Sequence, residues 1–119
     1  MLPKKNRADK KAIENIFKKG IFIRSSGLNL KYIFKNNIVS PPQISFIVPK
    51  TVEKKATKRN SLRRRGYISL LKYFNKIPNG FVGVFIFNKM KGNLTELIDK
   101  EIEIIFNKLK FINKNEKKD

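Results

Sequence analysis

The sequence predicts an α+β fold, a two-layer sandwich in which helices pack on one four-stranded sheet. Segments with helical spacing of apolar residues alternate with short runs typical of strands, and a strongly basic helix separates the third and fourth runs. With 119 residues, of which 40% are hydrophobic, the chain has enough apolar surface for one domain with a single core. The expected order of elements is α-β-β-β-α-β-α.

The N-terminal half predicts one helix followed by three strands. Ile13, Ile16 and Phe17 form an i, i+3, i+4 stripe, which indicates a helix from Ala8 to Lys19. Gly20 follows at the C-cap position, which favours a residue with positive φ. Strand-forming residues then gather in three runs separated by breaks that contain Ser, Gly, Asn and Pro. The expected strands are residues 21–24, 28–35 and 43–48.

The C-terminal half predicts a basic helix, a buried strand and a final helix. The basic helix is expected from about Lys58 to Asn75, because apolar residues recur at helical spacing in its second half. Phe81–Phe87 is apolar on both faces, as in a strand that is covered on both sides. Asn93 is the expected N-cap of the last helix. That helix has one apolar stripe, which includes Glu101 and ends at Leu109.

We expect a single nucleic-acid-binding α+β domain at residues 8–112, with a basic arm at residues 1–7 and a polar tail at residues 113–119. No internal repeat and no second domain is indicated. The basic N-terminus leads into no uninterrupted apolar run, so neither a signal peptide nor a membrane span is expected. The expected location is therefore the cytoplasm, and binding to a membrane surface is disfavoured for want of a broad apolar helix face.

The distribution of charge indicates a polyanionic partner. The formal net charge is +19, and residues 1–91 hold 22 Lys and Arg against 3 Asp and Glu, whereas residues 92–119 hold 6 of each. The whole excess, 22 − 3 = +19, therefore lies before the final helix. Self-repulsion of this size opposes folding unless a polyanion relieves it, and nucleic acid is the commonest such partner.

Residues 54–65 are the candidate nucleic-acid surface, because they are rich in Lys and Arg and contain no acidic residue. Arg pairs bidentately with phosphate, and an Asn amide can bind a base edge or a ribose. A basic helix face is often only solvated, but like charges at i, i+4 weaken a helix by a few tenths of a kcal/mol per pair, which favours a binding role. The candidate residues are Lys55, Lys58, Arg59, Asn60, Arg63, Arg64 and Arg65.

Several aromatic residues could stack on unpaired bases. The alternative for each is a place in the core, which is the commoner role of strand aromatics. The candidates for stacking are Phe17, Phe22, Tyr32, Phe34 and Phe46, whereas Phe85, Phe87 and Phe106 are expected in the core.

The composition disfavours a self-sufficient enzyme. The chain has no His and no Cys, which removes the usual general base and the commonest metal ligands. No phosphate-binding Gly-rich motif is present. Glu96, Asp99 and Glu103 share one side of the final helix and could bind a metal, but a solvated face is the favoured interpretation. We therefore expect no catalytic residue and no metal site in this chain.

The basic segment resembles a known family. Arg59-Asn60 followed by Arg63-Arg64, after a strand that ends Val48-Pro49-Lys50, is similar to the signature of the protein subunit of bacterial ribonuclease P. The opening residues 1–7 and the segment 16–20 are also similar to that family, so the resemblance covers nearly the whole chain. It implies a fold like the second domain of ribosomal protein S5, with the basic helix in a left-handed β-α-β crossover. The sequence alone would favour a right-handed one.

The resemblance also implies a mechanism. In that family the RNA subunit holds the catalytic Mg²⁺ and cleaves precursor tRNA, while one protein per RNA binds it through the basic helix. A central cleft of the protein holds the single-stranded 5′ leader. Here the resemblance places Phe17 and Lys50 in that cleft, and Ile13 stands where the family often has Phe. Ser61 and Tyr67 stand where Arg is common. The expected cleft residues are Ile13, Phe17, Tyr32, Phe46 and Lys50.

Two other functions remain open at this point. A structural RNA-binding protein of the ribosomal type, with no role in cleavage, would have the same charge and fold. It would not account for the Arg59-Asn60 signature together with the N-terminal pattern. A free-standing endonuclease is disfavoured by the missing catalytic groups.

Overall fold

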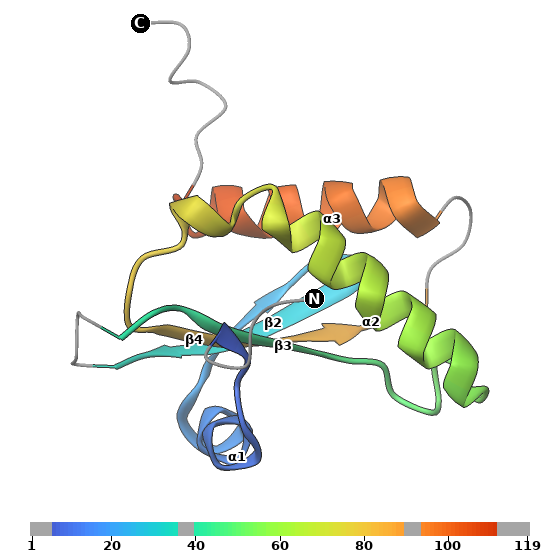
Figure 1. Cartoon of the computed structure of the whole chain (residues 1–119), viewed down its shortest axis with the longest axis horizontal. Coiled ribbons are helices and arrows are strands. Elements are labelled where there is room, and N and C mark those ends of the chain that lie inside the picture. The colour runs from blue at the N-terminus through green and yellow to red at the C-terminus, as the bar shows by residue number, and fades with distance from the viewer. Residues whose placement is uncertain (1–5, 36–39, 90–93, 112–119) are drawn as a thin grey trace, which may run out of the picture.

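The structure, a computed structural model, describes residues 6–35, 40–89 and 94–111 and confirms the predicted order of elements (Figure 1). The expected N-terminal arm and C-terminal tail lie largely or wholly outside these residues. The helices and strands are α1 (Lys10–Lys19), β1 (Ile21–Arg24), β2 (Leu28–Phe34), β3 (Gln43–Ile47), α2 (Ala56–Leu71), the 3-10 helix η2 (Phe74–Lys76), β4 (Phe81–Phe87) and α3 (Leu94–Lys108).

The bounds of α1 and α2 differ most from the predicted ones, while β2 and β3 each end one residue earlier than predicted. α1 begins at Lys10 because the Asp9 carboxylate accepts a hydrogen bond from the Ala12 amide at 2.8 Å, as an N-cap does. Gly20 has an extended backbone, so the predicted positive φ is wrong. Glycine is needed there for another reason, because a Cβ would lie 2.4 Å from the Ile16 carbonyl oxygen. α2 ends at Leu71, four residues before the predicted end at Asn75, where the chain tightens into η2.

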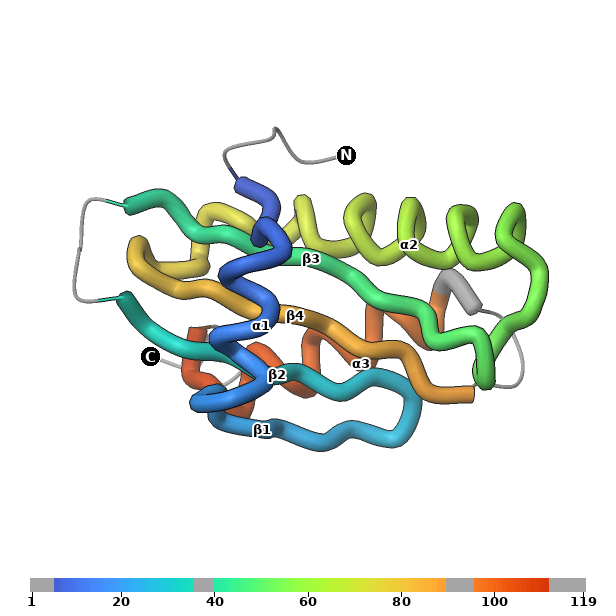
Figure 2. The backbone as a smooth tube through the Cα atoms, turned by 90° about the horizontal axis from the view of Figure 1, so that it is seen from below, coloured from blue at the N-terminus to red at the C-terminus, as the bar shows by residue number. Residues whose placement is uncertain are grey.

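The sheet has the strand order β1-β2-β4-β3. β1 and β2 form an antiparallel hairpin, β4 lies antiparallel to β2, and β3 runs parallel to β4. α2 makes the β3–β4 connection on the side of the sheet away from α1, and with β4 beside β3 as in Figure 2 the crossover is left-handed. The structure therefore has the uncommon hand, as the family resemblance implied and the general preference did not.

Helices cover both faces of the sheet (Figures 1 and 2). α2 and α3 lie side by side on one face, and α1 crosses the other face. Alternate residues of each strand point to opposite faces, so Phe81, Phe85 and Phe87 of β4 join the core under α2 and α3. Val82 and Val84 form a smaller core under α1 with Ile16.

A buried carboxylate ties the β1–β2 turn to α3. Glu101 accepts hydrogen bonds from the Gly27 amide at 2.7 Å, from the Ser26 hydroxyl at 3.1 Å and from the Ser25 hydroxyl. Burial by itself would raise the pKa of Glu101, but the hydrogen bonds from Ser25, Gly27 and their neighbours outweigh it and hold the pKa below its ordinary value. The position that looks like a polar interruption of an apolar stripe is therefore an anchor for the hairpin.

Candidate nucleic-acid interface

The basic residues of α2 fall into two groups by exposure. Two of them, Arg59 and Arg63, are half-buried. The others are exposed: Lys55, Lys58, Asn60, Arg64 and Arg65. The first turn of α2 contains no acidic residue and its N-cap, Lys55, has no side-chain cap. The positive end of the helix dipole adds to the charge of the lysines and arginines there, and the Glu53 carboxylate, which accepts from the Lys55 amide at 3.1 Å, offsets part of it.

Arg59 is held by the loop that precedes its own helix. Its Nη1 donates to the carbonyl oxygens of Glu53 at 3.0 Å and Lys54 at 2.6 Å. The same loop is closed by the Val52 and Glu53 amides, which donate to the Pro49 carbonyl oxygen at 2.9 and 3.1 Å. Arg59 thus fixes the segment between β3 and α2, which also carries the exposed Lys50.

Asn60 and Arg63 act as a pair. The Arg63 guanidinium donates to the Asn60 side-chain oxygen one helical turn away. That contact uses the Asn60 oxygen, so the Asn60 amide group can donate to a partner on the exposed side of α2, next to the Arg63 guanidinium.

Close packing against β3 sets the position of α2 on the sheet. A Cβ on Gly66 would lie 2.7 Å from two ring carbons of Phe46, so only glycine permits this approach. The Tyr67 ring meets Phe46 edge to face at 4.9 Å, and the Tyr67 hydroxyl accepts a hydrogen bond from the Phe46 amide at 3.3 Å. The basic helix is therefore fixed on the core, and its charged side chains are presented from a rigid support.

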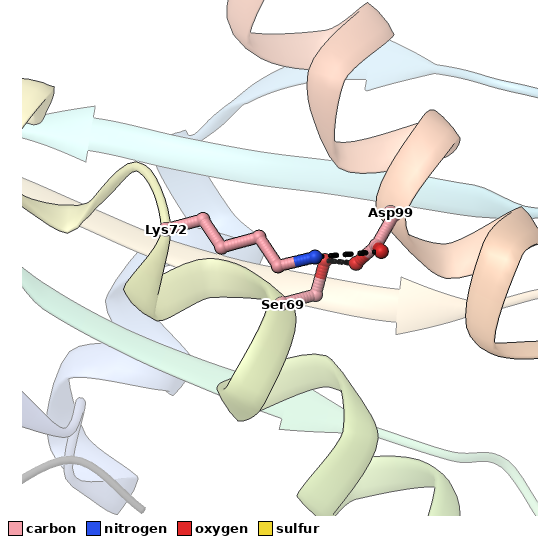
Figure 3. A network of polar contacts seen from close by, with 3 residues as sticks. All are labelled: Ser69, Lys72 and Asp99. Atoms are coloured by element: carbon pink, nitrogen blue, oxygen red, sulfur yellow. Dashed lines mark hydrogen bonds and ion pairs between the residues drawn. The ribbon is translucent and has the colours of Figure 1, made fainter.

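The end of α2 that is farther from the basic residues is joined to α3. Asp99 accepts from Lys72 at 2.8 Å and from the Ser69 hydroxyl (Figure 3). The hydrogen bonds from Lys72 and Ser69 lower the pKa of Asp99, and the bond to Asp99 raises the pKa of Lys72. Asp99 therefore serves the helix pair, and in the described ranges no three His, Cys, Asp or Glu residues lie together as a metal site would require.

A second surface lies on the other side of the sheet, beside α1. Phe17 is 45% exposed, and the Lys31 ammonium of β2 lies 5.4 Å from its ring centre. Lys31 also donates to the Phe17 carbonyl oxygen at 3.1 Å. Ile13, one turn earlier, is half-buried against the small core under α1. The structure therefore brings together Ile13, Phe17 and Lys31.

Two of the residues expected in the cleft lie on the opposite face, and this grouping needs correction. Tyr32 follows Lys31 along β2 and points toward α3, where it stacks on Phe81 with ring centres 5.4 Å apart. Phe46 is buried between Tyr67 and Phe85 at 3% exposure. Both are therefore core aromatics and cannot share a ligand with Phe17. The strand alternation of residues 28–34 could have shown that Lys31, rather than Tyr32, shares the face that carries α1.

A cavity of about 580 Å³ opens beside α1, and Phe17 is not among the residues that line it. None of the residues predicted from the sequence lines it. Its walls combine lysines with two carboxylates and two amides, and they consist of Asp9, Lys11, Ala12, Glu14, Asn15, Lys18, Lys35 and Gln43.

Among the described helices, none has the length and apolar character needed to cross a bilayer.

Comparisons with known proteins give matches that cover most of the chain. A family model described as Ribonuclease P matches residues 2–110. The ribonuclease P protein components of Borrelia duttonii (strain Ly) and Borrelia recurrentis (strain A1) are each 34% identical over 83 residues, which is 69% of this chain and 70% of theirs.

Solved structures share the fold at lower identity. The ribonuclease P protein of Staphylococcus aureus superimposes with a TM-score of 0.75 at 18% identity, over 91% of this chain and 98% of that one. The protein from Thermotoga maritima gives a TM-score of 0.69 at 22% identity, over 90% and 97%. These similarities show that the chain shares the fold of both proteins.

Proposed function

The chain belongs to the ribonuclease P protein family, whose role is the processing of the tRNA 5′ leader, and we propose that it binds both the catalytic RNA and precursor tRNA. One protein would bind one RNA and act in the cytoplasm. The observation that carries the proposal is the presence of two different surfaces on the two faces of one sheet: a rigid basic helix and an exposed aromatic beside a lysine.

The basic helix suits the backbone of a folded RNA. Lys55, Lys58, Arg64 and Arg65 provide exposed charge along α2, and Asn60 adds a hydrogen-bond donor among them. Phosphate contacts of this kind supply affinity and fix orientation without reading sequence. This is the chemistry that assembly with a catalytic RNA requires.

The Phe17 surface suits an unpaired strand. A phenyl ring can stack on any base, and an adjacent ammonium can bind the neighbouring phosphate. Phe17 and Lys31 together meet both conditions, since Phe17 supplies the ring and the Lys31 ammonium lies against one side of it. The 5′ leader of precursor tRNA is a single strand, and mature tRNA lacks it, so this surface would distinguish substrate from product.

The catalytic Mg²⁺ is proposed to reside on the RNA subunit, where it would supply the activated water for hydrolysis. Two of the described carboxylates support that division, because Glu101 is hydrogen-bonded to the β1–β2 turn and Asp99 to Ser69 and Lys72. The protein would add affinity, orient the leader and screen phosphate repulsion between the two RNAs.

The test is cleavage of precursor tRNA by a bacterial ribonuclease P RNA, at low Mg²⁺ and near-physiological salt, with and without this protein. We expect 5′-end cleavage that the RNA alone does not sustain. A double variant, Arg64→Gln with Arg65→Gln, should lose most of this stimulation, whereas Lys76→Gln, at an exposed lysine of η2 beyond the other end of α2, should retain it. Tight RNA binding without stimulation would instead favour a structural RNA-binding protein.

A further inference from the structure

The edge strand β1 carries an aromatic residue and a cation on the face of the sheet that carries α1. Phe22 of β1 is the cross-strand partner of Lys31, and Arg24 is the partner of Asn29. Paired residues of an antiparallel ladder project to the same face, and so do residues two apart on one strand. Because Lys31 contacts Phe17 of α1, Phe22 and Arg24 share the face on which α1 lies.

Phe22 repeats the arrangement found at Phe17. It is 42% exposed, against 45% for Phe17, and the Arg24 guanidinium lies 5.5 Å from its ring centre, as the Lys31 ammonium lies 5.4 Å from that of Phe17. Lys31 stands between the two rings, as the contact of one and the strand partner of the other. Aromatic and cationic side chains therefore alternate across the surface as Phe17, Lys31, Phe22 and Arg24.

This alternation matches the repeat of single-stranded RNA. Each nucleotide of an unpaired strand offers one base to stack and one phosphate to neutralise, and aromatic rings and guanidinium planes both accept bases without regard to sequence. The four side chains contribute two positive charges and no negative one. An edge strand is also a place where a charged residue prevents pairing with other chains, and Arg24 has that simpler role as the alternative.

We propose that Phe22 and Arg24 form a second stacking site for single-stranded RNA, which extends the path of the leader from Phe17 across Lys31 to the edge of the sheet. This rests on the proposed function for the identity of the strand, since the same surface would bind any unpaired RNA. Leader nucleotides that lie farther from the cleavage site would reach Phe22 after Phe17 is already occupied.

The experiment measures the affinity of the reconstituted holoenzyme for precursor tRNAs whose leaders are lengthened one nucleotide at a time. Phe22→Ala should bind substrates with the shortest leaders as the wild type does, and should lose roughly five-fold or more in affinity once the leader is long enough to reach β1. Phe17→Ala should lose affinity at shorter leader lengths. Ile21→Ala is the matched control, because Ile21 is the neighbouring residue, is 58% exposed, and points to the other face of β1.

Two outcomes would overturn the proposal. If Phe22→Ala loses the same affinity at every leader length, the role of Phe22 is in stability. If it loses no affinity at any length, the leader does not bind there, and Arg24 only prevents the edge strand from pairing with other chains. Phe22→Leu keeps apolar volume and removes the ring, so it decides the matter if Phe22→Ala does not fold.

A separate measurement keeps the test independent of cleavage. The affinity of the free protein for a fluorescent unstructured oligonucleotide should fall in Phe22→Leu and in Arg24→Gln, and should be unchanged in Ile21→Ala. If the holoenzyme shows no stimulation at all, the proposed function fails, but this comparison still decides whether Phe22 and Arg24 bind RNA. If all three variants bind the oligonucleotide with the affinity of the wild type, the proposed site is rejected.

Discussion

Gly66 of α2 lies against the ring face of Phe46 of β3, closely enough that a Cβ at Gly66 would come within 2.7 Å of two ring carbons. Phe46 has no room to retreat, since it is buried and stacks on Phe85 with ring centres 4.9 Å apart. The helix that carries the candidate RNA-binding residues is therefore seated on the sheet at a single glycine.

Gly66→Ala should destabilise the protein. Alanine favours a helix by about 1 kcal/mol over glycine, but overpacking of a filled core costs about 1–3 kcal/mol, so we expect a net loss of about 1 kcal/mol. The midpoint of urea unfolding checks this. Phe46→Leu should make room for the added methyl group, so the double variant should be less destabilised than the sum of the two single variants. A more stable Gly66→Ala protein would contradict the packing described.

Glu101 should make stability depend on pH. Because its folded pKa lies below the ordinary value of 4.5, its contribution is complete above that pH and is lost as pH falls through the lower, folded pKa. The free energy of unfolding should therefore fall on acidification, and Glu101→Gln should flatten this dependence. Asp99 also has a lowered pKa, so part of the dependence should persist in the variant. Parallel pH profiles for the two proteins would argue against the anchor.

Glu101→Gln should also weaken the protein at neutral pH. Hydrogen bonds to a charged group contribute about 1.5–3 kcal/mol, and an amide cannot accept from all of its present donors. Hydrogen exchange should show the effect first at the Gly27 amide, which donates to this carboxylate at 2.7 Å. A global loss of stability with no local change at Gly27 would indicate a different cause.

Arg59→Ala should act in two ways at once. It removes one positive charge, which should lower the salt dependence of RNA binding by about one unit of slope if that charge meets a phosphate. It also removes the contacts to the Glu53 and Lys54 carbonyl oxygens, so the Val52 and Glu53 amides should exchange faster. Arg64→Ala is the control, since Arg64 is exposed and should change the slope but not the exchange.

Phe17→Ala should weaken binding of precursor tRNA more than binding of mature tRNA. A stacked base contributes about 1–3 kcal/mol, and only the precursor has a leader to stack. Equilibrium binding of the holoenzyme to both tRNAs checks this. Phe46→Leu should lower stability and leave the preference for precursor unchanged, because Phe46 lies in the core under α2. Equal losses for both tRNAs in Phe17→Ala would assign Phe17 to packing alone.

Much of the fold follows from the sequence because its elements are short and strongly patterned. The face of each strand residue was harder to assign, since a difference of one position reverses it. Lys31 and Tyr32 are neighbours, and aromatic chemistry drew attention to Tyr32, whereas the ladder places Lys31 beside Phe17. Phe46 alternates with the polar residues Gln43 and Ser45, so the alternation of its strand could have placed it on the core face.

Long-range partners were beyond the sequence for a different reason. Glu101 stood among apolar positions with nothing nearby to explain it, and its donors lie more than 70 residues earlier in the chain. No local pattern encodes which side of β3 receives β4, so the hand of the crossover could be expected only from the family resemblance of the sequence.

The place of β4 in the sheet has a consequence for synthesis. β4 is the last strand in the sequence, yet it lies between β2 and β3 and joins them. During synthesis, the β1–β2 hairpin, β3 and the basic helix therefore leave the ribosome before β4 does. β3 has no strand partner until β4 follows and completes the sheet. Such late, non-local pairing slows folding, and it leaves a nascent polycation surrounded by ribosomal RNA before its own surface has formed.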